Sequence, residues 1–262
     1  MTWIEALILG IIQGLTEFLP VSSSGHLELG KALLGIEAKE SLMFSVAVHG
    51  ATVLSTIIVF RKEILHLLEG IFKFRYNEET QYALKIVISM VPVGIIGVLF
   101  KDTIKGLFTG NVLLVGAMLL VTALLLAFTY YAKEREKSPS YGHAFLMGMA
   151  QAIAVLPGIS RSGATISTGL LLGNRRDEVA QFSFLMVLLP IIGENFLDLI
   201  SGEMAASSVG TTPLIIGSLA AFITGLVACT WMLKLVKKGK LIWFALYCAL
   251  VGGAAIIAHF FI

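Results

Sequence analysis

The chain has few charged residues and only two cysteines. Asp, Glu, Lys and Arg make up 14% of its 262 residues, and 57% are hydrophobic, whereas charged residues form roughly a quarter of an ordinary soluble domain. The net charge of +2 favours no nucleic-acid partner. Cys229 and Cys248 both lie in apolar runs, where a thiol acts as a small hydrophobe, so we expect no disulfide framework or cysteine metal site. The composition therefore predicts an integral membrane protein.

Positive charge is absent from the start of the chain. The first cationic side chain is Lys31, whereas a cleaved secretory signal begins with a positively charged region. We therefore expect no cleaved signal, and we expect Met1 to stay in the mature protein.

Apolar runs of about 20 residues are long enough to cross a bilayer as helices. Such runs occur at residues 42–60, 82–100, 112–131, 179–200, 213–236 and 241–262. Four further apolar segments are too short to cross alone: residues 3–19, 26–34, 144–156 and 164–172. A polar segment joins each short pair. Such pairs predict re-entrant helices, whose irregular backbone is tolerated at membrane depth only where it faces protein or a wet cavity.

Lys and Arg predict the sidedness, because they accumulate in cytoplasmic loops. If the chain crosses six times and both polar segments dip in and return, 14 of the 19 cationic residues fall on one side. These are Arg61, Lys62, Lys73, Arg75, Lys85, Lys133, Arg135, Lys137, Arg175, Arg176, Lys234, Lys237, Lys238 and Lys240. Both termini then lie outside, and the polar segments enter from opposite leaflets.

This arrangement predicts an inverted-topology repeat, because three spans follow each re-entrant pair. The expected fold is an all-α integral membrane protein with six transmembrane helices plus two re-entrant helix pairs. Residues 1–262 form a single membrane domain, with residues 1–131 and 142–262 as the two repeats. The two broken helices should meet near the middle of the membrane.

The first polar segment contains groups suited to an anion. Gln13 and Glu17 are four residues apart, so they project from one face of a helix. Pro20 interrupts that helix. A new helix then begins at Ser22-Ser23-Ser24-Gly25, and a helix N-terminus offers free amide donors and a partial positive charge to a phosphate.

The second polar segment repeats this pattern with a cation added. It contains Ser160-Arg161-Ser162-Gly163, and Gln151 precedes it in an apolar run. The planar fork of Arg161 can hold two phosphate oxygens and never loses its proton. The two segments together imply a phosphorylated ligand within or at the edge of the bilayer.

Two long ordered motifs carry a family resemblance. They are Gln13-Gly14-Leu15-Thr16-Glu17-Phe18-Leu19-Pro20-Val21-Ser22-Ser23-Ser24-Gly25-His26 and Pro157-Gly158-Ile159-Ser160-Arg161-Ser162-Gly163-Ala164-Thr165. The chain resembles the undecaprenyl-diphosphate phosphatase family, the bacitracin-resistance type of bacterial membrane phosphatase, along its whole length, including Phe182-Ser183-Phe184. The resemblance implies hydrolysis of undecaprenyl diphosphate to the monophosphate and phosphate, which recycles the lipid carrier for cell-wall polysaccharides. It also implies a multi-pass protein of the bacterial inner membrane with its site open to the outer side.

The resemblance also implies roles for particular residues. Glu17 matches the carboxylate that binds a cation or handles a proton, Ser23 and His26 the nucleophile and base region, and Arg161 the phosphate clamp. The substrate-binding positions are Gln13, Ser22, Ser24, Gly25, Ser160, Ser162, Gly163 and Thr165. The implied cofactor is Mg²⁺ or Ca²⁺. Since Gln13 is neutral and ligates a hard cation less well than a carboxylate, Glu17 is the expected anionic ligand.

The sequence leaves several alternatives open. The nucleophile is Ser23 activated by His26, His26 itself, or a water. His49 is more typical of a packing residue than of a ligand. Glu194 and Asp198 are expected in a cavity or an interface.

Two functional classes fit the same architecture. A transporter or flippase for polyprenyl phosphate is the alternative to the phosphatase, because inverted repeats are common in transporters. Translocation needs only phosphate clamps, whereas hydrolysis also needs a nucleophile and proton handling. Faces of small residues permit a homodimer without requiring one.

Overall fold

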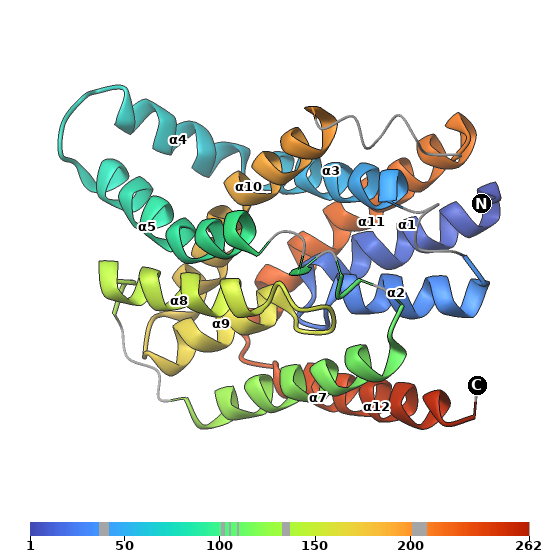
Figure 1. Cartoon of the computed structure of the whole chain (residues 1–262). Coiled ribbons are helices and arrows are strands. Elements are labelled where there is room, and N and C mark those ends of the chain that lie inside the picture. The colour runs from blue at the N-terminus through green and yellow to red at the C-terminus, as the bar shows by residue number, and fades with distance from the viewer. Residues whose placement is uncertain are drawn as a thin grey trace.

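The protein is a bundle of helices (Figure 1). The computed structural model describes residues 1–36, 42–100, 103–104, 106–108, 110–132, 137–200 and 209–261, with no account of the side chains of residues 42, 194 and 196–200. Glu194 and Asp198, predicted in a cavity or an interface, therefore lie outside the described side chains. Within the described part, the β-type pairing is one isolated bridge between Lys137 and Asn174.

The first broken helix consists of α1 (Trp3–Phe18) and α2 (Ser23–Leu34). A capping box starts α1, because Thr2 Oγ1 accepts from the amide of Glu5 while the Glu5 carboxylate accepts from the amide of Thr2. The helix ends just before Pro20, as predicted. Ser22 then caps α2 through its Oγ, which accepts from the amide of Gly25 at 3.2 Å.

The second broken helix consists of α8 (Tyr141–Ile153) and α9 (Arg161–Leu171). Its connecting loop passes so close to α7 (Val112–Phe128) that Gly158, with φ of 99°, would place a Cβ 2.6 Å from the carbonyl oxygen of Val115. Thr122 of α7 donates to the carbonyl of Gly158 at 3.0 Å and accepts from the amide of Ser160 at 2.9 Å. The loop is thus fixed at the start of α9.

The predicted apolar runs all lie in helices. Besides α7, which continues as η2 (Thr129–Tyr131), these are α3 (Leu42–Val59), α5 (Glu78–Leu99), α10 (Arg176–Ile200), α11 (Thr211–Lys237) and α12 (Ile242–His259). Within the described residues, four helices are long and apolar enough to cross a membrane: α5, α7 with η2, α11 and α12. A fifth is possible if α3 and the amphipathic α4 (Arg61–Ile71), bent by 74°, count as one span. The structure thus gives a multi-pass helical membrane protein, and the number six stays a prediction.

The two halves of the chain exchange packing partners. Helix α1 packs on α11, and α8 packs on α5, so each broken helix lies against a long helix of the other half. Helices α7 and α12 pack side by side at the bottom of Figure 1, and α3 contacts α10. Glycine permits the closest approach, because a Cβ on Gly14 would overlap Thr224 of α11. This packing brings the ends of α1 and α8 toward the middle of the bundle.

Candidate active site

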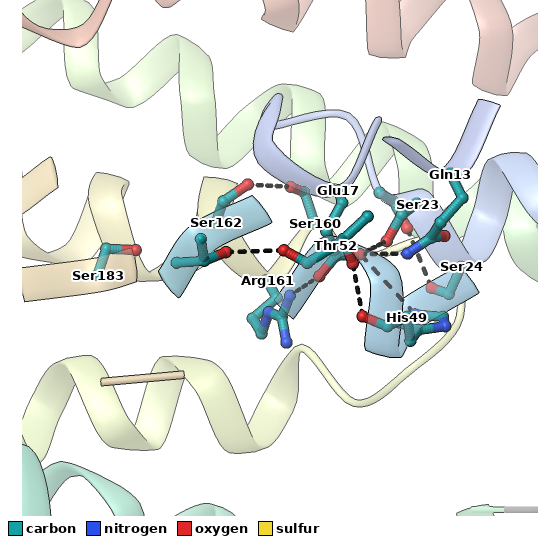
Figure 2. A network of polar contacts seen from close by, with 12 residues as sticks. Gln13, Glu17, Ser23, Ser24, His49, Thr52, Ser160, Arg161, Ser162 and Ser183 are labelled. Carbon is teal, nitrogen blue, oxygen red and sulfur yellow. Dashed lines mark hydrogen bonds and ion pairs between the residues drawn. The ribbon is translucent and has the colours of Figure 1, made fainter. Parts of the chain in front are cut away.

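Glu17 is the centre of a polar network inside the bundle (Figure 2). It lies in the last turn of α1, and its side chain is only 4% exposed. Its Oε2 accepts hydrogen bonds from Gln13 Nε2 at 2.9 Å and from Ser23 Oγ at 2.6 Å. Its Oε1 accepts from Arg161 Nη2. Burying a carboxylate is costly unless it is paired and hydrogen-bonded, and all of these contacts serve that purpose.

The Glu17–Arg161 ion pair joins the two polar segments. Arg161 is the first residue of α9, 144 positions further along the chain. A second link runs beside it, since Ser162 Oγ donates to the carbonyl of Leu19 at 3.2 Å. The sequence predicted that the segments would converge, and these contacts confirm it. Since the arginine side chain is 27% exposed, it is the more accessible member of the pair.

Ser23 and His26 do not form the pair that the resemblance suggested. Ser23 donates to Glu17, while His26 Nδ1 lies 2.9 Å from the carbonyl of Ser22 and Nε2 lies 2.8 Å from the hydroxyl of Tyr247. A carbonyl can only accept, so Nδ1 carries the hydrogen and a neutral His26 accepts from Tyr247 at Nε2. The imidazole also stacks on the Tyr247 ring, with centroids 5.6 Å apart. In this arrangement the base facing Ser23 is Glu17.

The hydroxyls of the other predicted serines lie at the starts of α2 and α9, where two of them cap the helix. Ser22 caps α2, and Ser160 caps α9 by accepting from the amide of Gly163 at 3.0 Å. Ser24 and Ser162 lie 3.3 Å from these caps, oxygen to oxygen. The amides of Gly25 and Gly163 are thus already bonded, and a phosphate would have to displace the hydroxyls to reach them.

Two of the predicted substrate-binding residues, Ser22 and Thr165, have further structural features. Ser22 adopts φ of 70°, which is unusual for a residue with a side chain, and such conformations cluster at functional sites. Thr165 donates to the carbonyl of Arg161 at 2.9 Å and lies 2.5 Å from Ser183 Oγ of α10. Thr165 therefore ties α9 to α10 directly behind the arginine.

The sequence favoured a packing role for His49 and gave no signal for Tyr247, yet both lie at the site. His49 of α3 is held by its Nδ1 on the carbonyl of Ser45 at 2.8 Å, which leaves Nε2 3.8 Å from Glu17 Oε2. A histidine within an apolar run gives no signal of the helix it will face. Tyr247 stands 221 residues from His26, in a run whose composition indicates only a membrane span. The polar character of both side chains at membrane depth was the available signal.

A cleft begins at this network. It is narrow, with a free volume of about 10 Å³, and is lined by α1, α3, α9 and α10. Glu17, Arg161, Ser162, Ser183, Thr52 and Thr56 form its polar part, and Phe18, Val53, Phe184, Val187, Leu188 and Ile191 its apolar part. Charged and apolar side chains thus meet within one narrow cleft.

The described residues do not fit a preformed divalent-cation site. Among them, no group of three or more His, Cys, Asp or Glu side chains could hold a metal ion. Both oxygens of Glu17 are engaged by donors. The oxygen that stays open is Gln13 Oε1, which is buried and has no partner within the described part of the chain. One neutral oxygen is a poor site for Mg²⁺ or Ca²⁺, which bind through several oxygen ligands.

The fold and the site together define a multi-pass helical membrane protein with a buried polar centre suited to an anionic headgroup. The chain belongs to the family described as bacitracin resistance protein BacA, whose model matches residues 6–254. It is 58% identical over 256 residues to a protein of Parabacteroides distasonis, which covers 96% of each chain. It is 57% identical over 261 residues to one of Bacteroides fragilis, 98% of each chain, and 60% identical over 255 residues to one of Christiangramia forsetii, 97% of each chain. All three relatives are named undecaprenyl-diphosphatase.

Proposed function

We propose that the protein hydrolyses undecaprenyl diphosphate to undecaprenyl phosphate and inorganic phosphate, and so recycles the lipid carrier of cell-wall synthesis. The observation that carries the proposal is the 2.6 Å hydrogen bond from Ser23 to Glu17, formed beside Arg161. It brings a nucleophile, a base and a phosphate-binding cation into contact. The names of relatives at 57–60% identity support the same reaction.

The geometry supports a two-step mechanism. Ser23 Oγ attacks the terminal phosphorus, its proton passes to Glu17 Oε2, and the bond from phosphorus to the bridging oxygen breaks to release the lipid monophosphate. Arg161 turns from the neutralised carboxyl to the equatorial phosphoryl oxygens, where charge must be stabilised. Glu17 passes the proton from Ser23 to the bridging oxygen of the departing lipid monophosphate. Water then attacks the phosphoserine while Glu17 accepts a proton from that water and gives it to Ser23 Oγ as the bond from phosphorus to Oγ breaks. Phosphate leaves and the serine hydroxyl is restored.

His26 does not take the proton of Ser23 in this arrangement, because both of its ring nitrogens are engaged, by Ser22 and Tyr247. Direct attack by His26 or by water remains an alternative outcome. A radiolabelled phosphoryl group trapped on Ser23 supports the serine route, one trapped on His26 supports the histidine route, and failure to trap either supports water.

Phosphate release by the purified protein in detergent tests the function itself. We expect wild-type protein to release phosphate from undecaprenyl diphosphate, and Glu17→Ala and Arg161→Ala to abolish release while the protein remains folded. A folded but inert wild-type protein would favour the transporter or flippase, for which phosphate clamps suffice. The Ser23–Glu17 bond favours the enzyme, because a clamp has no need of a hydroxyl held by a base.

The role of a divalent cation is tested in the same assay. We propose that Mg²⁺ or Ca²⁺ supports turnover, although the described residues offer no preformed site. A chelator should then lower phosphate release, and restoring either ion should recover it. Unchanged release in chelator would show that Arg161 and the helix termini are sufficient.

We further propose the full topology: six crossings, two re-entrant pairs, repeats at residues 1–131 and 142–262, and a site open to the outer side of the inner membrane. The exchanged packing of α1 on α11 and α8 on α5 supports an inverted repeat. Single introduced cysteines test it by labelling from either side, since Cys229 and Cys248 are fully buried and give little background. The homodimer is tested by the mass of the detergent-solubilised protein.

A further inference from the structure

A buried ion pair lies on α2, outside the polar network around Glu17. Glu28 and Lys31 are three residues apart, so their side chains meet on one face of the helix, with Lys31 Nζ 3.2 Å from Glu28 Oε1. The glutamate side chain is 7% exposed and the lysine side chain 10%. Removing two charges from water is costly, and their attraction repays that cost only when further hydrogen bonds complete the pair. The contacts that complete this pair reach two other parts of the bundle.

Each charge holds a different element. Glu28 Oε2 accepts from the amide of Gly110 at 3.1 Å, just before α7 begins. Lys31 Nζ donates to Ser45 Oγ at 3.2 Å, in the first turn of α3. The pair therefore connects α2 to the start of α7 and to α3. Apolar side chains could fill the same space, but they could not make these directional hydrogen bonds.

The helices α2 and α3 also supply two groups that face Glu17 (Figure 2). Ser23, the first residue of α2, places its Oγ 2.6 Å from Glu17 Oε2. His49 stands one turn after Ser45 on α3, and the Ser45 carbonyl holds its Nδ1 at 2.8 Å. Its Nε2 lies 3.8 Å from the same Oε2. The geometry around this oxygen thus depends on the position of α2 relative to α3, the two helices that the buried ion pair connects.

We propose that Glu28 and Lys31 are positioning residues: they fix α2 against α3 and so keep the serine and the histidine in place beside Glu17. The inference rests on the proposed function, because phosphate release is the reaction for which they position these groups. They act through the two helices and not on the substrate. A buried ion pair can often be replaced by apolar residues of similar volume without loss of stability. The proposal therefore predicts that an apolar pair leaves the protein stable but slow.

The double variant Glu28→Leu/Lys31→Met separates positioning from stability. Both charges disappear together, so neither is left unpaired. We expect Tm to stay unchanged or rise. With undecaprenyl diphosphate, kcat for phosphate release should fall about ten- to a hundredfold while KM stays within about twofold, because displaced reacting groups slow the chemical step without weakening substrate binding. Wild-type kcat in this stable variant would overturn the proposal.

A smaller change keeps the proposal falsifiable if the double variant fails to fold. Ser45→Ala removes the oxygen that binds Lys31 and leaves the backbone carbonyl that holds His49. We expect kcat to fall about threefold or more. Thr230→Ala, which removes a hydroxyl bonded to Leu226 of its own helix, is the control and should leave kcat unchanged. Adding Ser45→Ala to the apolar double variant should have no further effect, because its partner is already gone. Equal kcat in the serine and threonine variants, or a further fall in the combined variant, would overturn the proposal.

The separation of α2 and α3 can be measured without an activity assay. Leu33→Cys on α2 and Leu54→Cys on α3 replace side chains that are 84% and 56% exposed, and spin labels there report the distance by electron paramagnetic resonance. Cys229 and Cys248 are fully buried and label little. We expect a wider or shifted distance distribution in the apolar double variant than in the wild-type background, and an unchanged distribution overturns the positioning role. An inert wild type whose distribution nevertheless widens in the variant overturns the proposed hydrolysis and leaves the positioning standing.

Discussion

Replacing Glu17 by Gln keeps the shape of the side chain and removes the negative charge that faces Arg161. In the mechanism above this removes the group that takes the proton of Ser23, and a positioned general base contributes roughly 10²–10⁴ in rate. We therefore expect kcat of Glu17→Gln to fall by about that factor. The change also leaves Arg161 without its carboxylate, and breaking a buried ion pair costs about 3–5 kcal/mol. Since the arginine side chain is 27% exposed and water can replace part of the contact, we expect the lower end of that range.

Phosphate release and thermal unfolding of the same preparations separate these two effects. Ser23→Ala is the matched variant, because it loses the nucleophile and one hydrogen bond worth about 1 kcal/mol but keeps the ion pair. The double variant Glu17→Gln/Ser23→Ala should be no slower than the slower single variant, because groups acting in one step are not additive. Losses that multiply in the double variant would refute the Ser23–Glu17 pair, as would Glu17→Gln with near wild-type kcat.

Three further changes test other contacts. Tyr247→Phe keeps the ring stacked on His26 but removes the hydroxyl that contacts Nε2, so we expect kcat to fall by up to about tenfold, the size of one lost hydrogen bond, with KM unchanged. His49→Gln removes the imidazole whose Nε2 lies 3.8 Å from Glu17 Oε2, and we expect a smaller fall in kcat without loss of folded protein, measured by phosphate release and size-exclusion chromatography. Gly158→Ala places a methyl group against the backbone of α7 at a positive φ, and we expect about 1–3 kcal/mol of destabilisation, measured as the loss of thermal stability.

The histidine and glycine changes each have a control in the same chain. His66→Gln alters a histidine on α4 whose side chain is 70% exposed and lies 3.1 Å from Glu79, and it should leave phosphate release unchanged. Gly94→Ala places a methyl group where the structure has open space and should not lower stability. Tyr247→Phe behaving like wild type would remove Tyr247 from the mechanism, and Gly158→Ala as stable as Gly94→Ala would show that the loop can move away from α7.

The sequence predicted the two broken helices because their signals are local. Pro20 must end a helix, and serine with glycine starts the next one, so both breaks could be placed within a few residues. The meeting of Glu17 and Arg161 followed from the symmetry of the two polar segments rather than from either alone. Contacts made by the uniformly apolar helices could not be placed. Nothing in the sequence orients α12 so that Tyr247 reaches His26, or α3 so that His49 reaches Glu17, because a helix apolar on all sides has no periodicity that reveals its inner face.

The ion pair at the centre of the site also explains how such a charged centre exists among apolar helices. Paired with Glu17, Arg161 contributes no net charge to the interior, and the hydrogen bonds of Ser23 and Gln13 complete the compensation. A diphosphate entering the cleft offers the arginine a partner with more negative charge than one carboxylate and with oxygens spaced for its planar fork. In the proposed mechanism Ser23 gives its proton to Glu17, and the neutral carboxyl then no longer competes for the guanidinium. Proton transfer and phosphate binding therefore reinforce each other. Protonation of Glu17 frees Arg161 for the phosphate, and binding of Arg161 to the phosphate frees Glu17 to accept the proton.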